Sequence, residues 1–170
     1  MNPIVHAELS WLTGVRLASR RDRLLVTLAG VVPDADGLTL LLGEEPYSRW
    51  HHVVTHGLVA AVACSLLCGL VAERKVAVGA LAFLAFHLHL LCDLAGSGPG
   101  WPLTYLWPFT REELSWSGQW DLASWQNTGL GLTVTLLVLA CAVWFDRTIV
   151  ELFSLKADRA VVTTVRKRLE

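Results

Sequence analysis

The sequence predicts an all-α integral membrane protein, built as a small bundle of apolar helices. Of its 170 residues, 54% are apolar and only 17% are charged, whereas soluble domains carry about 25% charged residues. The mean hydropathy is +0.48, and the longest apolar runs could cross a bilayer. The net charge is −1 and no basic surface stands out, so we expect no nucleic-acid partner.

Three segments have the length that a bilayer core of about 30 Å requires, which is about 20 helical residues. They are Val53 to Ala72, Val76 to Ala95 and Gly129 to Phe145. We predict that all three are transmembrane helices. The first carries a small residue at every fourth position: Gly57, Ala61, Ser65 and Gly69. Such spacing lets a neighbouring helix approach closely, so we expect this helix at the centre of the bundle.

The N-terminal part predicts a helical hairpin. A fourth apolar stretch, Leu24 to Val32, is too short to cross the bilayer alone and follows the basic tip formed by residues 20–23. Together with Ile4 to Ser19 it would form a hairpin whose arginines extend to the far interface. The first residues lack the basic start and long apolar run of a cleavable secretory signal.

The placement of Lys and Arg predicts the orientation. If the three spans and the hairpin alternate, only Arg49 and Arg111 fall on one side, and all other basic residues fall on the other. The basic side is expected to be cytoplasmic. The chain would then be a multi-pass protein of a bacterial-type inner membrane, with residues 1–146 as the membrane-embedded domain and residues 147–170 as a polar cytoplasmic helix or tail.

Two segments would face outward in this topology, Pro33 to His52 and Gly96 to Thr128. Trp101, Trp107, Trp116, Trp120 and Trp125 all lie in the second segment. Tryptophan is enriched at the level of the lipid headgroups. We therefore expect a tryptophan-rich outer loop that covers the outer end of the bundle.

The same outer end gathers histidines and aspartates. The candidate residues are His6; Asp34 and Asp36; His51, His52 and His56; His87, His89 and Asp93; and Asp121. An ionisable group within a membrane costs several kcal/mol unless it is partnered, so such groups are functional candidates. Every histidine of the chain belongs to this set, which predicts a metal site.

Helical spacing selects among these residues. His89 and Asp93 are four positions apart and would share one face of a helix, as would His52 and His56. His87 and His89 are two apart and point about 200° away from each other. We therefore include His89 in the site and exclude His87.

Imidazole and carboxylate ligands suit zinc, with manganese or iron as alternatives, and a site this rich could hold one or two ions sharing a bridging carboxylate. In an enzyme such ions activate water for hydrolysis, and Asp34 or Asp36 could accept the proton. Arg49 and Arg111 are candidate partners of a phosphate, although ordinary anchoring at the interface explains them equally well. Trp107 and Asp121 complete the candidate substrate contacts. The position of the site favours membrane lipids or another lipid-linked phosphoester as substrate.

Three other functions fit parts of the pattern. Histidines on neighbouring helices can ligate haem from both faces, as in an electron carrier, but haem does not need the aspartates. A transporter would need more spans than three. A non-catalytic scaffold could hold a structural metal in the same residues.

The chain resembles the YdjM-like family of membrane-bound metal-dependent hydrolases, sometimes described as LexA-binding inner-membrane proteins. The resemblance runs from His6 to about Phe109 and rests on ordered short motifs. These are an early His, the sequence Pro33-Asp34-Ala35-Asp36, a His-rich turn that ends in Thr55-His56, His89-x-x-x-Asp93, and Trp107-Pro108-Phe109. The family is similar in turn to zinc-dependent phospholipase C and the fungal single-strand nucleases.

The resemblance implies a ligand set. One metal would lie among His56, His89, Asp93 and one of Asp34 and Asp36; a second would lie between His6 and Asp93. His51 corresponds to the first His of the family pattern His-Arg-Gly-x-Thr-His. The chain departs from that pattern because His52 and Val53 replace Arg-Gly, which leaves His52 as a further ligand or a general base.

Overall fold

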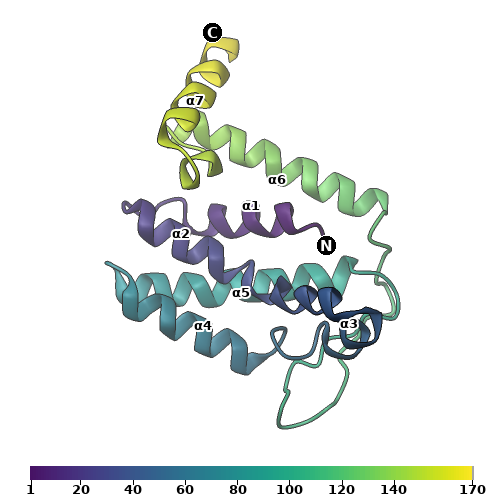
Figure 1. The fold of residues 1–170 in the computed structure, drawn as a ribbon. Helices are drawn as coiled ribbons and strands as arrows, with labels where there is room; N and C mark the ends of the chain where they lie inside the picture. Colours follow the sequence, from purple (N-terminus) through teal and green to yellow (C-terminus); the bar gives the residue numbers. More distant parts are fainter. Residues whose placement is uncertain (170) are drawn as a thin grey trace.

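The computed structural model describes residues 1–169, which form seven α-helices and two 3-10 helices (Figure 1). Within this range the only β-pairing is one isolated bridge, between Leu103 and Leu114. The elements are α1 (Pro3–Gly14), α2 (Arg20–Ala29), η1 (Val32–Leu42), α3 (Glu44–Trp50), α4 (Leu58–Val71), α5 (Lys75–Gly96), α6 (Trp125–Trp144), η2 (Ile149–Leu152) and α7 (Leu155–Leu169).

Helices α1 and α2 form the predicted N-terminal hairpin and pack on α5. Asn2 begins α1 by accepting the Ile4 N–H, and Pro3 follows in the first turn, where its missing N–H costs nothing. In the core beside α5, Val26 and Ala29 are completely buried. Gly30 ends α2 where it meets α1, and a Cβ there would lie 1.8 Å from Ser10 Oγ.

Two helices, α5 and α6, are long and apolar enough to cross a membrane. A third candidate span is the pair α2 and η1, which are bent by 53° at the break between them. The segment Pro33 to His52 was predicted as an outer loop, but it consists largely of the helices η1 and α3. An all-helical membrane bundle is confirmed with two or three candidate spans.

The prediction that Val53 to Ala72 is a full span is not confirmed. Helix α4 begins only at Leu58 and has 14 residues, which is about 21 Å of helix. Residues 51–57 form an irregular turn instead, in which His52 has a φ of 64°, a conformation that interrupts a helix.

The small-residue ladder of α4 faces α5, but α4 lies at the edge of the bundle rather than at its centre (Figure 1). Ala61, Ser65 and Gly69 are buried, and a Cβ on Gly69 would lie 3.4 Å from Gly79 Cα of α5. Leu66 and Leu70 on the other faces are exposed. The ladder therefore allows one close contact, and the remaining surface is free to meet lipid.

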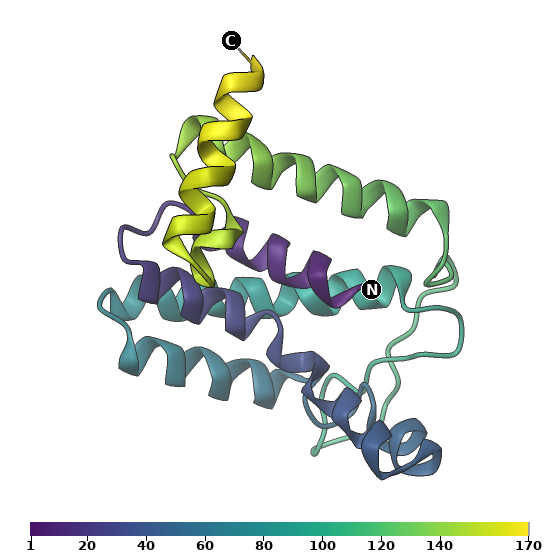
Figure 2. The same cartoon turned by 45° about the horizontal axis from the view of Figure 1, so that its top comes forward.

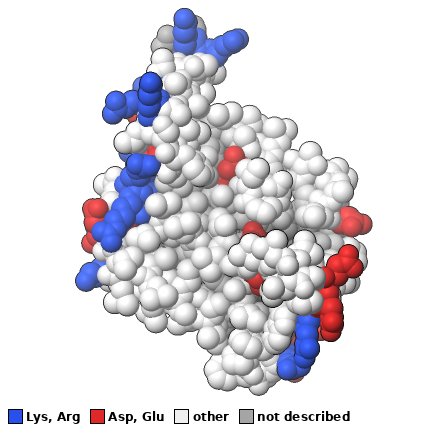
Figure 3. Space-filling model, viewed as in Figure 1, with Lys and Arg blue, Asp and Glu red and all other residues white. Residues whose placement is uncertain are grey.

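Most basic residues gather at one end of the bundle, where the α1–α2 turn, the α4–α5 turn and α7 lie, and a smaller basic patch lies at the opposite end (Figure 3). Helix α7 projects away from the other helices (Figure 2). Arg23, predicted to extend to the interface, is instead buried. Its guanidinium makes two bonds of 2.5 Å to Glu151, and Glu151 also accepts from Trp11 Nε1. This ion pair ties the hairpin to η2.

Candidate metal centre

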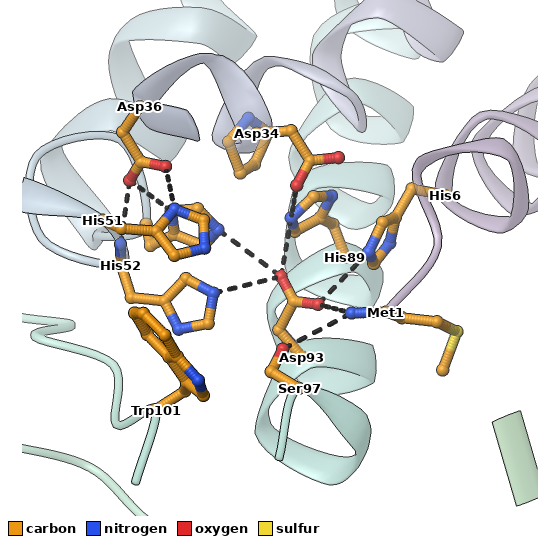
Figure 4. A network of polar contacts seen from close by, with 12 residues as sticks. Met1, His6, Asp34, Asp36, His51, His52, His89, Asp93, Ser97 and Trp101 are labelled. Carbon is orange, nitrogen blue, oxygen red and sulfur yellow. Dashed lines mark hydrogen bonds and ion pairs between the residues drawn. The ribbon is translucent and has the colours of Figure 1, made fainter. Parts of the chain in front are cut away.

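Four segments bring histidines and aspartates together at the other end of the bundle (Figure 4). Two groups of side chains are close enough to hold an ion. The first is His6 from α1, Asp34 from η1, and His89 and Asp93 from α5; the second is His52 and His56 from the turn before α4, again with Asp93. Within each group the possible ligand atoms lie within 4.8 Å of one another.

Asp93 is the centre of the arrangement because its two oxygens serve both groups. Oδ1 lies 3.2 Å from His6 Nε2. Oδ2 lies 2.8 Å from His89 Nε2, 3.4 Å from His56 Nε2 and 3.9 Å from His52 Nε2. The carboxylate thus has the position of a ligand that bridges two ions.

Two of the histidines whose Nε2 faces Asp93 are oriented by a hydrogen bond at the other ring nitrogen, Nδ1. His89 Nδ1 donates to the Gly30 carbonyl at 2.8 Å, and His56 Nδ1 pairs with Asp36 Oδ2 at 2.8 Å. Metal-binding histidines commonly have such an outer partner, which fixes the ring and leaves Nε2 for the ion. Gly30 was not predicted, since a backbone carbonyl leaves no signal in the sequence.

Asp36 and His51 lie beside the two groups rather than in them. Besides His56, Asp36 accepts from the His52 backbone N–H at 2.9 Å and pairs with His51 Nδ1 at 2.7 Å. Both oxygens of Asp36 are therefore used to hold the histidine turn. The geometry gives Asp36 a positioning role, whereas Asp34 reaches the first group directly, with Oδ1 3.7 Å from His89 Nε2.

The unpaired atoms of the site test whether a cation fits. All six side chains of the two groups have a buried polar atom without a hydrogen-bonding partner of good geometry: His6, Asp34, His52, His56, His89 and Asp93. Buried polar groups are otherwise nearly always hydrogen-bonded, and those left unpaired require an explanation. A bound cation would provide the missing partner to the Nε2 and carboxylate atoms, so the residues fit a metal.

The histidine turn, residues 51–57, lies outside the candidate membrane spans. Two of its histidines, His52 and His56, have pKa values shifted in opposite directions. Burial, with the neighbouring His56, lowers the pKa of His52 to about 3, so its ring is neutral and has a lone pair to offer. Burial acts on His56 in the same direction, but hydrogen bonds with Asp36 and Asp93 outweigh it and raise its pKa to about 9. His56 is thus placed between two carboxylates, where positive charge is stabilised.

Other predicted residues lie around the site. Arg49, Arg111 and Trp107 line one cavity of about 180 Å³, and a second of about 530 Å³ extends from Arg49 to His51. Asp121 is exposed and lines neither cavity. His87 lies apart from both groups, with its ring nitrogens paired to the Phe83 carbonyl and the Tyr105 hydroxyl.

Two contacts were not predicted. The α-amino group of Met1 donates to Asp93 Oδ1 at 2.5 Å and places a positive charge beside this carboxylate. The Trp101 ring packs edge-on against His51, with ring centroids 5.3 Å apart, so the tryptophan-rich loop reaches the site. Its density of tryptophan predicted a cover over the site but not which ring makes the contact.

The packing of the rings disfavours the haem alternative. The rings of His6 and His89 are stacked with centroids 3.7 Å apart, and those of His52 and His56 are 4.4 Å apart. Two axial histidines must enclose a porphyrin between them. Stacked rings at these distances leave no room for one.

The fold and the site define a helical membrane protein with a buried histidine–aspartate cluster that could hold metal. The family model of the YdjM inner membrane protein matches residues 1–156. The chain belongs to this family, which confirms the resemblance and indicates an inner-membrane protein. Neither the curated proteins nor the solved structures contain a match.

Proposed function

We propose that the chain is a metal-dependent hydrolase of phosphoesters, acting at the membrane interface on lipid-type substrates. The observation that carries this proposal is the pair of ligand groups sharing Asp93. Paired ions bridged by a carboxylate are a common arrangement in phosphoester hydrolysis. Zinc suits these ligands, and manganese or iron would also be accepted.

A bound ion would supply Lewis acidity and make water nucleophilic at neutral pH. The proton released from that water would be accepted by a side chain of the protein. Asp34 lines a pocket of about 420 Å³ together with His52 and Asp93, and its Oδ2 has no hydrogen-bond partner. Asp34 is therefore better placed than Asp36 to accept a proton from water. His52 Nδ1 also lacks a partner, but its side chain is only 4% exposed against 24% for Asp34, which makes it the weaker candidate.

The surroundings of the pocket favour an anionic substrate. Arg49 lines the adjoining cavity with His51 and Glu113, and Arg111 lines a smaller cavity that shares Arg49 and Glu113 with it. Guanidinium groups bind phosphate oxygens in a bidentate manner. An ester held near Asp93 would thus have the Arg49 guanidinium in the adjoining cavity, at a level where phospholipid headgroups are available.

The activity can be tested on the purified full-length protein in detergent. Loaded with Zn²⁺, Mn²⁺ or Fe²⁺, it should hydrolyse chromogenic phosphoesters or phospholipids in mixed micelles, and a chelator should abolish the reaction. His89→Ala should lower turnover by at least about 100-fold, because a ligand and its orienting bond are lost. His87→Ala, two positions away on the same helix, should keep full turnover. Tight metal binding without turnover of any ester would favour the scaffold function and refute a hydrolase.

The site is expected to face outward, with α7 in the cytoplasm. The basic end of the bundle lies opposite the site, and basic flanks remain on the cytoplasmic side. In a chain whose four native cysteines are replaced by alanine, Ser117→Cys should react with an impermeant maleimide in intact cells. Thr163→Cys on α7 should react only after lysis. The reverse labelling pattern would contradict this orientation.

A further inference from the structure

A groove lies between α1 and the candidate membrane span α6. Its volume is about 630 Å³, and Ile4, Val5, Gly131 and Leu132 form part of its walls. Helix α6 contacts α1 along a narrow seam, to which Val134 contributes. Because α6 is a candidate membrane span, the groove opens where the acyl chains of lipids lie.

The groove adjoins the pocket of the candidate metal centre. Met1, Pro3 and Leu122 line both the groove and the 420 Å³ pocket that contains Asp34 and Asp93. A single extended molecule could therefore occupy the two spaces together. One end of that molecule would lie among the metal ligands and the other beside α6.

The charges along this path indicate which end of the bound molecule would carry its phosphate. Among the residues that line the groove there is no Lys or Arg, and the one carboxylate, Glu8, is buried and accepts a hydrogen bond from Thr135 Oγ1 at 2.8 Å. A phosphate beside Glu8 would meet that carboxylate, and the one cation of the lining, the Met1 amine, lies at the end that the groove shares with the pocket. At the other end, a cation held by the ligand groups would attract an anion, and the Met1 amine lies beside them.

We propose that the groove between α1 and α6 binds one hydrocarbon chain of a phospholipid whose phosphate lies at the metal centre. This inference rests on the proposed function, since it names the substrate class of the same site. It requires the lipid to enter sideways from the bilayer. The groove would then select substrates that carry a hydrocarbon chain. Soluble phosphoesters would use only the metal end.

Photocrosslinking tests the groove without requiring turnover. The full-length protein is placed in nanodiscs that contain phosphatidic acid with a diazirine midway along one acyl chain, and the labelled peptides are mapped by mass spectrometry. In the unaltered chain, labelling should concentrate on the groove segments of α1 and α6. Thr128→Trp, which fills the groove, should lower this labelling about tenfold, because burial of several methylenes is lost.

Thr133→Trp is the matched control. Thr128 and Thr133 are both exposed threonines of α6, and each donates its hydroxyl to the carbonyl four residues earlier, but only Thr128 lines the groove. Thr133→Trp should leave the labelling of the groove unchanged, and both variants should retain their metal. Equal labelling in the two variants would overturn the proposal.

A second probe distinguishes this proposal from the proposed function. Diacylglycerol with the same photoreactive chain lacks the phosphate and should label the groove about tenfold less than phosphatidic acid. Equal labelling by both probes would overturn the placement of the phosphate. If groove labelling follows the expected pattern while no ester is hydrolysed, the lipid site stands and the hydrolase proposal fails.

Discussion

Asp93→Asn should strip the protein of most of its metal. The carboxylate is the one ligand shared by both groups, and its two oxygens face four imidazoles. Outer partners of metal ligands alone contribute about 10- to 100-fold to affinity, so the loss of a shared ligand should exceed about 100-fold. The metal content of the purified protein, measured by elemental analysis, should fall from about one or two ions per chain to nearly none.

Asp121→Asn provides the control for this experiment. Asp121 belongs to the same outer end of the chain but is exposed and outside both groups, so its variant should keep its metal. Helical content and thermal unfolding should be recorded for both variants, since a chain that no longer folds would also lose metal. A folded Asp93→Asn variant with full metal content would refute the assignment of the site.

Glu151→Ala should cause the largest loss of stability away from the site. It leaves the Arg23 guanidinium buried, with only the carbonyls of Leu17 and Ala18 as partners, and removes the acceptor of Trp11 Nε1. Breaking a buried ion pair in this way costs about 3–5 kcal/mol. Denaturant unfolding in detergent micelles, followed by circular dichroism, should show a decrease of that size.

The double variant Arg23→Met with Glu151→Leu separates the buried charge from the packing. It replaces both partners with apolar groups, so much of the lost stability should return. Asp146→Asn removes the charge from the exposed pair with Arg166 but leaves the bonds of Arg166 to the Ala142 and Val143 carbonyls, and it should cost at most about 1 kcal/mol. If the single and double variants unfold alike, the effect belongs to packing and not to an unpaired charge.

Much of the site could be predicted because its ligands lie in short local patterns. The spacing of His89 and Asp93 places both on one face of α5, and the same geometry turns His87 away. The hydropathy of α5 and α6 likewise predicts two long helices. These features depend on residues close together in the sequence, so the helical period is sufficient to find them.

Other features depend on partners far along the chain. The apolar residues after Val53 suggest a helix, but the bonds of Asp36 to His51, His52 and His56 hold this part of the chain as a turn. The burial of Arg23 requires Glu151, 128 positions away. No local pattern reveals such pairs, and they account for the shortened α4 and the buried arginine.

The sharing of Asp93 has a consequence for how the site would fill. One carboxylate has a single negative charge, and two divalent ions held by the two ligand groups would repel each other. The first ion would bind without a neighbouring ion, and the second against the field of the first. Occupancy would therefore rise in two separate stages, and over a broad range of metal concentration most chains would hold a single ion.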